Sequence, residues 1–326
     1  MRRSALARGG LIAVAIVVLQ ALLIPLFAGP ATHLAPRDLP LAVAGPAEMA
    51  ARLPQGAFDV TVVPDAATAD ARIKDRTVYG AVIVSPAGPA LHVASAASPT
   101  VAALLEQAAT QLGGGRPVPV VDVVPTDKDD PHGAGFASGF LPMAVTGLLA
   151  GILTYLLVRR RGARLVTLVV FAALAGLAGA AVQQYWLGVL PGGYLADASA
   201  MALFALAVSA AATGLGAVFD RAGLALAAVT IFLVGNALSG LAAAPELLPQ
   251  PWGTVGQYLP IGAGGTLLRS VAYFDGHGGT RSLIVLAAYA AGGLLLVALG
   301  RRGLRTRKAE TASATIGSQS QPAMAG

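Results

Sequence analysis

The stretch LPQPWGTVGQYLPIGAGGTLLRS (248–270) is too apolar for an ordinary loop, yet proline and glycine interrupt it too often for a helix that spans a bilayer. Apolar residues at helical spacing predict two short helices, broken around LPIGAGG (259–265), where Pro260 and Gly262 stand. Non-helical backbone is tolerated at membrane depth only where protein or a watery cavity satisfies its polar groups. We therefore expect a re-entrant or interfacial hairpin on the outer side, over about 245–275.

The hairpin carries side chains that suit the boundary between lipid and water. Trp252 and Tyr258 combine an apolar ring with a polar group, so we expect them at the level of the lipid headgroups. Arg269 has a long apolar stem, and we expect it to extend outward to water or to pair with Asp275 or Glu246.

The composition of the 326-residue chain indicates an integral membrane protein. Hydrophobic residues make up 56% of the chain and charged residues only 12%, and the mean hydropathy is +0.70. Most of such a chain cannot be a water-exposed globule. The chain contains no cysteine, which excludes a disulfide framework, a thiolate zinc site and a cysteine nucleophile.

Six apolar stretches are long enough to cross a bilayer, whose core takes roughly 17 to 25 predominantly apolar residues. The first follows a charged head, as in a secretory signal, and AGPA (28–31) loosely resembles a cleavage site. Its apolar run exceeds the usual signal core of roughly 7 to 15 residues, so we expect an uncleaved anchor. The sequence thus predicts an α-helical polytopic membrane protein with six transmembrane helices, at 11–28, 139–158, 165–187, 199–219, 222–242 and 282–300.

Residues 29–138 have the ordinary polarity of a folded soluble domain. Val-rich runs bounded by Pro and Gly predict strands, and the segments between them predict helices, with Asp65 and either Ser98 or Thr100 as N-caps. This alternation predicts a small α/β domain inserted between the first and second spans. The expected strands are 39–45, 58–64, 78–86, 90–96 and 118–125, and the expected helices are 47–53, 65–76 and 100–112.

Positive charge orients the chain, because Lys and Arg are enriched in short cytoplasmic loops. With the N-terminus inside, 13 of the 22 Lys and Arg residues fall on the inner side, against the acidic residues Asp220 and Glu310. Both termini are then cytoplasmic, and the net charge of +6 reports topology. We expect contacts with anionic lipid and none with nucleic acid. The inner basic residues are Arg2, Arg3, Arg8, Arg159, Arg160, Arg161, Arg164, Arg221, Arg301, Arg302, Arg305, Arg307 and Lys308.

These features divide the chain into four parts. Residues 1–28 form the cytoplasmic N-terminus and the first transmembrane helix, and residues 29–138 form the extracytoplasmic α/β domain. Residues 139–300 form a five-helix transmembrane domain that includes the outer hairpin. The polar, unpatterned segment 301–326 is expected to be a disordered cytoplasmic tail.

Few polar residues lie within the predicted spans, which consist mainly of Ala, Gly and Leu. Gln183 and Gln184 fall near the outer end of the third span. Asn236 and Ser239, three residues apart on the fifth span, could bind a polar group of a substrate, but hydrogen bonds between helices are the role we expect.

The sequence offers no motif for catalysis. It contains neither G-x-S-x-G nor H-E-x-x-H, and its four histidines are isolated from one another. TDKDDPHGAG (126–135) could hold a cation, although a solvated turn before the second span fits its spacing better. No lysine follows a glycine, so a Walker A loop is absent and any ATPase must be another chain. We expect a protein that is not an enzyme, with no catalytic residue, cofactor or metal.

One N-terminal span, an α/β domain, five further spans and a proline-broken hairpin before the last span resemble the membrane subunits of ABC-2 type exporters. The chain is most similar to the phage-infection-protein-like branch of Gram-positive bacteria. The similarity covers nearly the whole chain by architecture and loose motifs. The matching segments are LPLAVAG (39–45), RTVYGAVIVSP (76–86), VVDVVPTDKDDPHGAGFASGFLP (120–142) and the hairpin.

This resemblance implies a permease subunit of the bacterial plasma membrane that exports an amphipathic or lipid-like molecule. It also implies a homo- or heterodimer driven by a separate cytoplasmic ATP-binding cassette ATPase. One feature departs from the pattern, since such exporters couple to their ATPase through a helical cytoplasmic element. Here the inner loops RRRGAR (159–164) and FDRAG (219–223) are minimal.

Two other classes of protein compete with the exporter. The first is a non-transporting envelope or receptor-like protein whose extracytoplasmic domain binds a partner. Five additional spans are more than such an anchor needs. The second is a membrane-embedded transferase, which would need acidic or histidine residues near the interface. Asp197, Asp220 and Asp275 are the acidic residues available for that role.

Overall fold

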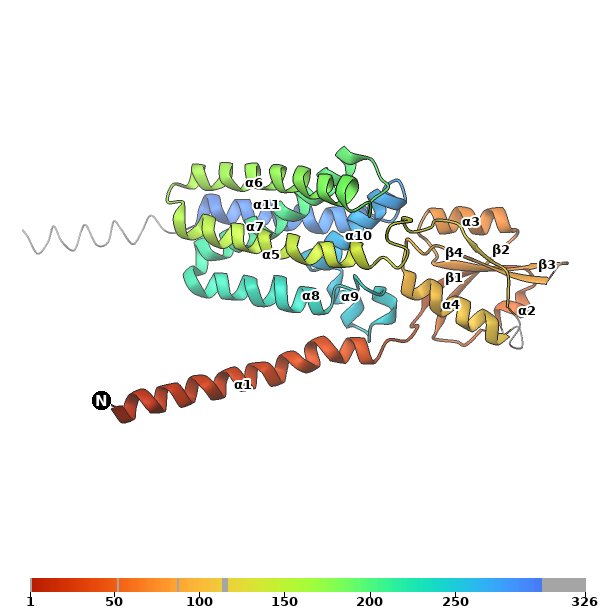
Figure 1. Cartoon of the computed structure of the whole chain (residues 1–326), viewed down its shortest axis with the longest axis horizontal. Coiled ribbons are helices and arrows are strands. Elements are labelled where there is room, and N and C mark those ends of the chain that lie inside the picture. The colour runs from red at the N-terminus through yellow and green to blue at the C-terminus, as the bar shows by residue number, and fades with distance from the viewer. Residues whose placement is uncertain (1, 52, 87, 113–116, 301–326) are drawn as a thin grey trace, which may run out of the picture.

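The computed structural model describes residues 2–51, 53–86, 88–112 and 117–300, so the tail predicted at 301–326 lies outside the described residues. A helical bundle is joined at one end to a small domain with a mixed sheet (Figure 1). The helices have the length and composition of a multi-pass membrane protein, as the sequence predicted. Five of them qualify as membrane spans: Gly9–Pro30, Ala134–Leu157, Arg161–Trp186, Tyr194–Ala237 and Thr280–Leu299.

The number of candidate spans differs from the predicted six because the expected fourth and fifth spans lie in one helical segment, Tyr194–Ala237. Its 44 residues would extend about 66 Å if straight, about twice the thickness of a bilayer core. The segment is broken at Asp220, where φ is 55° and ψ is −134°. A single non-helical residue makes this turn, so no loop separates the two halves.

The two halves of this segment lie against each other. A Cβ atom added to Gly223 would lie 2.0 Å from the carbonyl oxygen of Leu215. Eight residues of straight helix would separate these positions by about 12 Å. The chain therefore folds back at Asp220, inside α7 (Tyr194–Ala227), and the part of α7 after this residue continues through the π-helical turn η2 (Ala228–Val234) into α8 (Gly235–Ala237).

Helix α1 (Arg2–Thr32) runs apart from the bundle over most of its length (Figure 1). None of its apolar window is buried inside the molecule. Its C-terminal end contacts α8, and Pro25 and Pro30 lie inside this last part of the helix. Because water is a poor solvent for such a surface, membrane lipid is the medium that suits it.

The bundle packs around α7, which contacts α5 (Ala134–Leu157), α6 (Arg161–Ala181) and α11 (Thr280–Leu299). Helix α5 begins before residue 139, where the sequence predicted the start of the span. Glycines allow these helices to approach closely: a Cβ atom on Gly176 would lie 2.3 Å from the carbonyl oxygen of Ala198. This is the small-residue packing typical of membrane helices.

The small domain contains a five-stranded sheet in the order β2-β1-β3-β4-β5. Strand β1 pairs in parallel with β2 and β3, β3 pairs antiparallel with β4, and β4 pairs in parallel with β5. Each predicted strand and helix of residues 29–138 has its counterpart. The elements are β1 (Leu39–Ala44), α2 (Ala47–Ala50), β2 (Phe58–Val63), α3 (Ala66–Lys74), β3 (Gly80–Ser85), β4 (Gly88–Val93), α4 (Pro99–Leu112) and β5 (Val120–Asp122).

Two of the predicted caps begin the helices of this domain. Asp65 Oδ1 accepts a hydrogen bond from the Thr68 amide at 2.7 Å, and Ser98 Oγ accepts one from the Val101 amide at 3.2 Å. Such caps satisfy amide groups that have no partner within the helix. Helices α3 and α4 cover opposite faces of the sheet (Figure 1).

Apolar contacts on both faces of the sheet fix the domain to the bundle. On the α4 face, Leu39 and Leu91 pack in one buried cluster with Ala243 and Leu247 from the segment after α8. On the α3 face, Phe274 joins a second buried cluster of the domain. The hydrophobic core of the domain is thus continuous with residues of the helical bundle and its hairpin.

Neighbouring glycines of α11 test this packing. A Cβ atom on Gly293 would lie 2.4 Å from the carbonyl carbon of Ala210, whereas one on Gly292 would meet nothing within 4 Å. We expect Gly293→Ala to destabilise the protein by about 1–3 kcal/mol through overpacking. We expect Gly292→Ala to stay within about 1 kcal/mol of the wild type. Thermal unfolding in detergent measures both, and equal midpoints for the two variants would contradict the packing.

Candidate functional site

The hairpin forms two short helices, as predicted, after the 3₁₀ turn η3 (Pro245–Leu247). They are α9 (Trp252–Gly256) and α10 (Pro260–Tyr273). The break precedes Pro260 and does not extend through the glycines of 259–265, because proline suits the first turn of a helix, where its missing amide costs nothing. Gly262 lies inside α10, where an added Cβ atom would be 2.3 Å from the carbonyl oxygen of Gly256.

Between α8 and α9, several carbonyl groups of segment 239–247, which includes the 3₁₀ turn η3, accept hydrogen bonds from side chains in other parts of the chain. Gln257 Nε2 donates to the carbonyl of Ser239 at 2.9 Å, and Arg269 Nη2 donates to that of Leu241 at 3.1 Å. From the α/β domain, the hydroxyls of Thr100 and Ser98 donate to the backbone carbonyls of residues 242 and 243, and Arg37 Nη1 donates to the carbonyl of residue 247. The hairpin and the domain therefore hold this segment between them.

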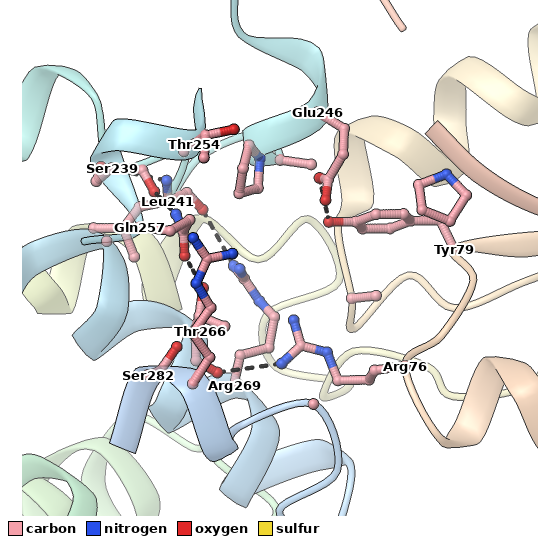
Figure 2. Close-up of a pocket in the computed structure, with 18 of the residues that line it drawn as sticks. Arg76, Tyr79, Ser239, Leu241, Glu246, Thr254, Gln257, Thr266, Arg269 and Ser282 are labelled. Atoms are coloured by element: carbon pink, nitrogen blue, oxygen red, sulfur yellow. Dashed lines mark hydrogen bonds between the residues drawn. The ribbon is translucent and has the colours of Figure 1, made fainter. Parts of the chain in front are cut away.

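A cavity of about 270 Å³ lies where the α/β domain meets the hairpin (Figure 2). Its charged lining consists of Arg76 from the domain, Arg269 from α10, Arg281 from α11 and a single carboxylate, Glu246. This gives the lining three cations and one anion. Its uncharged polar residues are Thr77, Tyr79, Ser239, Gln250, Thr254, Gln257, Thr266 and Ser282.

Arg269 is buried, with 8% of its surface exposed, and it does not extend outward as predicted. Its guanidinium lies 4.6 Å from the centre of the Phe136 ring. Among the described residues it has no ion pair with Asp275 or Glu246, because the carbonyl of Leu241 draws it inward. Burial, followed by the charge of Arg76, lowers its pKa to about 10, so Arg269 remains charged at neutral pH.

Arg76 joins the domain to the hairpin. It follows α3 with a positive φ of 55°, and its Nη1 donates to the carbonyl of Thr266 at 3.2 Å and to the Ser270 hydroxyl. The guanidinium lies 5.1 Å from the centre of the Phe274 ring. Burial lowers the pKa of Arg76, and the nearby Glu246 acts in the opposite direction.

Glu246 is the carboxylate of the cavity, and Tyr79 binds it. The Tyr79 hydroxyl donates to Glu246 Oε2 at 2.7 Å (Figure 2). Burial, followed by the charge of Glu246, raises the pKa of Tyr79 well above its usual value, so the phenol remains a donor. Glu246 offsets one of the three guanidinium charges in the lining, so the remaining positive charge attracts an anion. Guanidinium groups bind phosphate and carboxylate with paired hydrogen bonds.

The two predicted headgroup residues lie on the outside of the hairpin. Trp252 and Tyr258 are about half exposed, at 51% and 54%. Trp252 lines an apolar groove with α1, and the Tyr258 ring lies 4.2 Å from the Arg281 guanidinium carbon. Of the predicted hairpin residues, Gly262 and Arg269 line the cavity and Trp252 lines the groove, whereas Tyr258 and Pro260 line neither.

The predicted polar contacts of the spans separate into two groups. Ser239 lines the cavity, and its hydroxyl donates to the carbonyl of Asn236 within the same segment, at 2.9 Å. Gln183 donates to the sulfur of Met143 at 3.3 Å, and Gln184 donates to the carbonyl of Gly192 at 2.5 Å. The glutamines join elements of the bundle and do not line the cavity.

Sequence reasoning missed Arg76, and it did not predict that Asp197 is fully buried. Arg76 looked like one of several charged residues at the end of a domain helix. Asp197 has 0% exposure, and its oxygens have no hydrogen-bond partner among the described residues. The acidic segment TDKDDPHGAG (126–135) has a structural role, because the Asp130 carboxylate accepts hydrogen bonds from the backbone amides of Gly135 and Phe136 at the start of α5. Within the described ranges no group of acidic or histidine side chains is placed to hold a metal.

Comparisons with known proteins give no relative for this chain. No family model, no curated protein and no solved structure matches it. The geometry and charge of the cavity are therefore the structural basis for assigning a function.

Inorganic phosphate tests the cavity as an anion site. At about ten times its dissociation constant, phosphate should stabilise the wild-type protein by about 1.4 kcal/mol. Arg269→Met should lose this stabilisation. Because it also removes the donor to the Leu241 carbonyl, its thermal midpoint without phosphate should be lower than that of the wild type, and the phosphate effect is measured from that midpoint. Arg72→Met changes an arginine of α3, four residues before Arg76, and is the control; it should keep the stabilisation by phosphate. An equal phosphate effect on the thermal midpoint of all three proteins would contradict the assignment.

Proposed function

We propose that this chain is the membrane permease subunit of an ABC-2 type exporter that moves an amphipathic molecule with an anionic end. The observation that carries the proposal is the cationic cavity, whose walls come from both the α/β domain and the hairpin. A site shared in this way lets a bound molecule influence the contact between the two parts. The resemblance of the sequence to such exporters supports the same function.

In this proposal the chain crosses the bacterial plasma membrane six times, with both termini in the cytoplasm. The fold-back at Asp220 supports a fourth and a fifth span, since each half of the Tyr194–Ala237 segment is long enough for most of a bilayer. The basic turn at 159–161 and Arg221 would then face the cytoplasm, and the α/β domain would lie outside.

The proposed partners are a second permease subunit and a separate cytoplasmic ATPase. The inner turns of the described chain are short, with residues 158–160 between α5 and α6 and Asp220 in the other turn. An ATPase would therefore contact the ends of the helices themselves. The α/β domain shares apolar clusters with the membrane part, and this favours a transporter over a receptor whose domain is merely anchored.

Affinity purification in mild detergent from native membranes tests the exporter. We expect an ATP-binding cassette ATPase to copurify, and its hydrolysis of ATP to rise when an anionic amphiphile is added. The matched control is the same purification with Arg269→Met, which should retain the ATPase but lose the stimulation. Repeated recovery of the folded protein without an ATPase would favour the receptor-like envelope protein.

Substitutions in the hairpin test its role in transport. Gly262→Ala would force its methyl group against the carbonyl of Gly256 at the edge of the cavity, and Pro260→Ala would remove the residue that starts α10. We expect both variants to be expressed and to lose amphiphile-stimulated ATP hydrolysis at least tenfold. Gly292→Ala, with open space around the added methyl group, is the control. Unchanged stimulation in the hairpin variants would remove the hairpin from the mechanism.

A further inference from the structure

An apolar groove of about 340 Å³ lies between the C-terminal end of α1 and the hairpin. On the α1 side it is lined by Pro25, Leu26 and Gly29, and on the hairpin side by Leu238 and Trp252. Figure 1 shows α1 approaching α9 at this end of the bundle. The lining is almost entirely apolar, in contrast to the cationic cavity.

The groove and the cationic cavity lie on two sides of the same short helix, α9. Trp252 of this helix lines the groove, whereas Thr254, two residues later, lines the cavity. Likewise Leu238 lines the groove and Ser239 lines the cavity. Helix α9 packs directly on the backbone between them, since a Cβ atom on Gly256 would lie 1.7 Å from the carbonyl oxygen of Leu238. A molecule that enters both sites therefore passes the start of α9, where Pro249 lines the groove and Gln250 lines the cavity.

The two sites differ in depth when α1 is placed across a bilayer. The apolar window of α1 ends at Pro30, and Pro25 is about 7.5 Å further into the helix. In that placement the groove would lie beside the acyl chains nearest the membrane surface, and the cavity, between the hairpin and the α/β domain, would lie nearer the headgroups.

We infer that the two sites together bind one anionic phospholipid, with its phosphate in the cationic cavity and an acyl chain in the groove beside α1. Three guanidinium groups and several hydroxyl groups suit the oxygens of a phosphate. The unburied apolar surface of α1 leaves the groove open to neighbouring lipid. That this lipid is also the exported substrate rests on the proposed function, whereas its binding does not.

The test measures lipid binding to the purified full-length protein by native mass spectrometry. Phosphatidylglycerol should bind at least tenfold more tightly than phosphatidylcholine of the same chain length. Arg269→Met and Arg281→Gln should each remove most of this preference. The second variant changes an exposed residue, so its folding does not depend on replacing a buried charge.

A variant that fills the groove distinguishes binding of the acyl chain from binding of the headgroup. Gly29→Trp should lower the affinity for phosphatidylglycerol at least tenfold without changing the affinity for glycerol phosphate. Open space surrounds Gly29, so the new ring can occupy the groove. Val18→Trp, on the exposed surface of α1 away from the groove, is the control and should bind like the wild type.

The outcomes distinguish this inference from the exporter. If Gly29→Trp binds phosphatidylglycerol like the wild type, or if the protein shows no preference over phosphatidylcholine, the lipid site is overturned whatever the ATPase does. If the lipid binds as described but no ATPase copurifies and no ATP hydrolysis is stimulated, the lipid site is supported and the exporter function is contradicted.

Discussion

The structure depends on how the chain satisfies its backbone where it leaves the helix at residues 239–247. A carbonyl group without a donor costs several kcal/mol near lipid, so roughly half a dozen exposed carbonyls would not be tolerated there. Gln257 and Arg269 supply donors from the hairpin, and Ser98, Thr100 and Arg37 supply them from the α/β domain. This one segment thereby fixes the positions of the hairpin and the domain together.

The cationic cavity is a consequence of the same constraint. Arg269 reaches inward to the carbonyl of Leu241, and Arg76 reaches from the domain to Thr266 and Ser270. Both guanidinium groups thus enter a partly buried space, where their mutual repulsion lowers the stability of the protein. Glu246, already bound by Tyr79, offsets only part of this charge. A bound anion would relieve the repulsion, which explains why the cavity suits an anionic ligand.

Local sequence patterns predicted where helices and strands lie, whereas contacts between residues far apart in the sequence could not be predicted from it. Asp65 begins a helix through the amide three residues later, so this start could be predicted from the sequence, whereas Pro260 was predicted to lie in the break and instead lies in the first turn of α10. The direction of Arg269 depends on the carbonyl of residue 241 and on Phe136, which lie far away in the chain. The minimal inner turn predicted at 219–223 is made by a single residue with positive φ, Asp220, so the two expected spans are continuous in one helical segment.

The most direct test of the account is the accessibility of a single cysteine in the cavity. The natural chain has no cysteine, so in Thr254→Cys the new thiol is the only one, and it lines the cavity on an exposed part of α9. A maleimide that cannot cross membranes should label it in intact cells, and lysophosphatidylglycerol should slow the labelling severalfold while lysophosphatidylcholine should not. Labelling that requires permeabilised cells, or that both lipids slow equally, would contradict an outward-facing cavity for an anionic amphiphile.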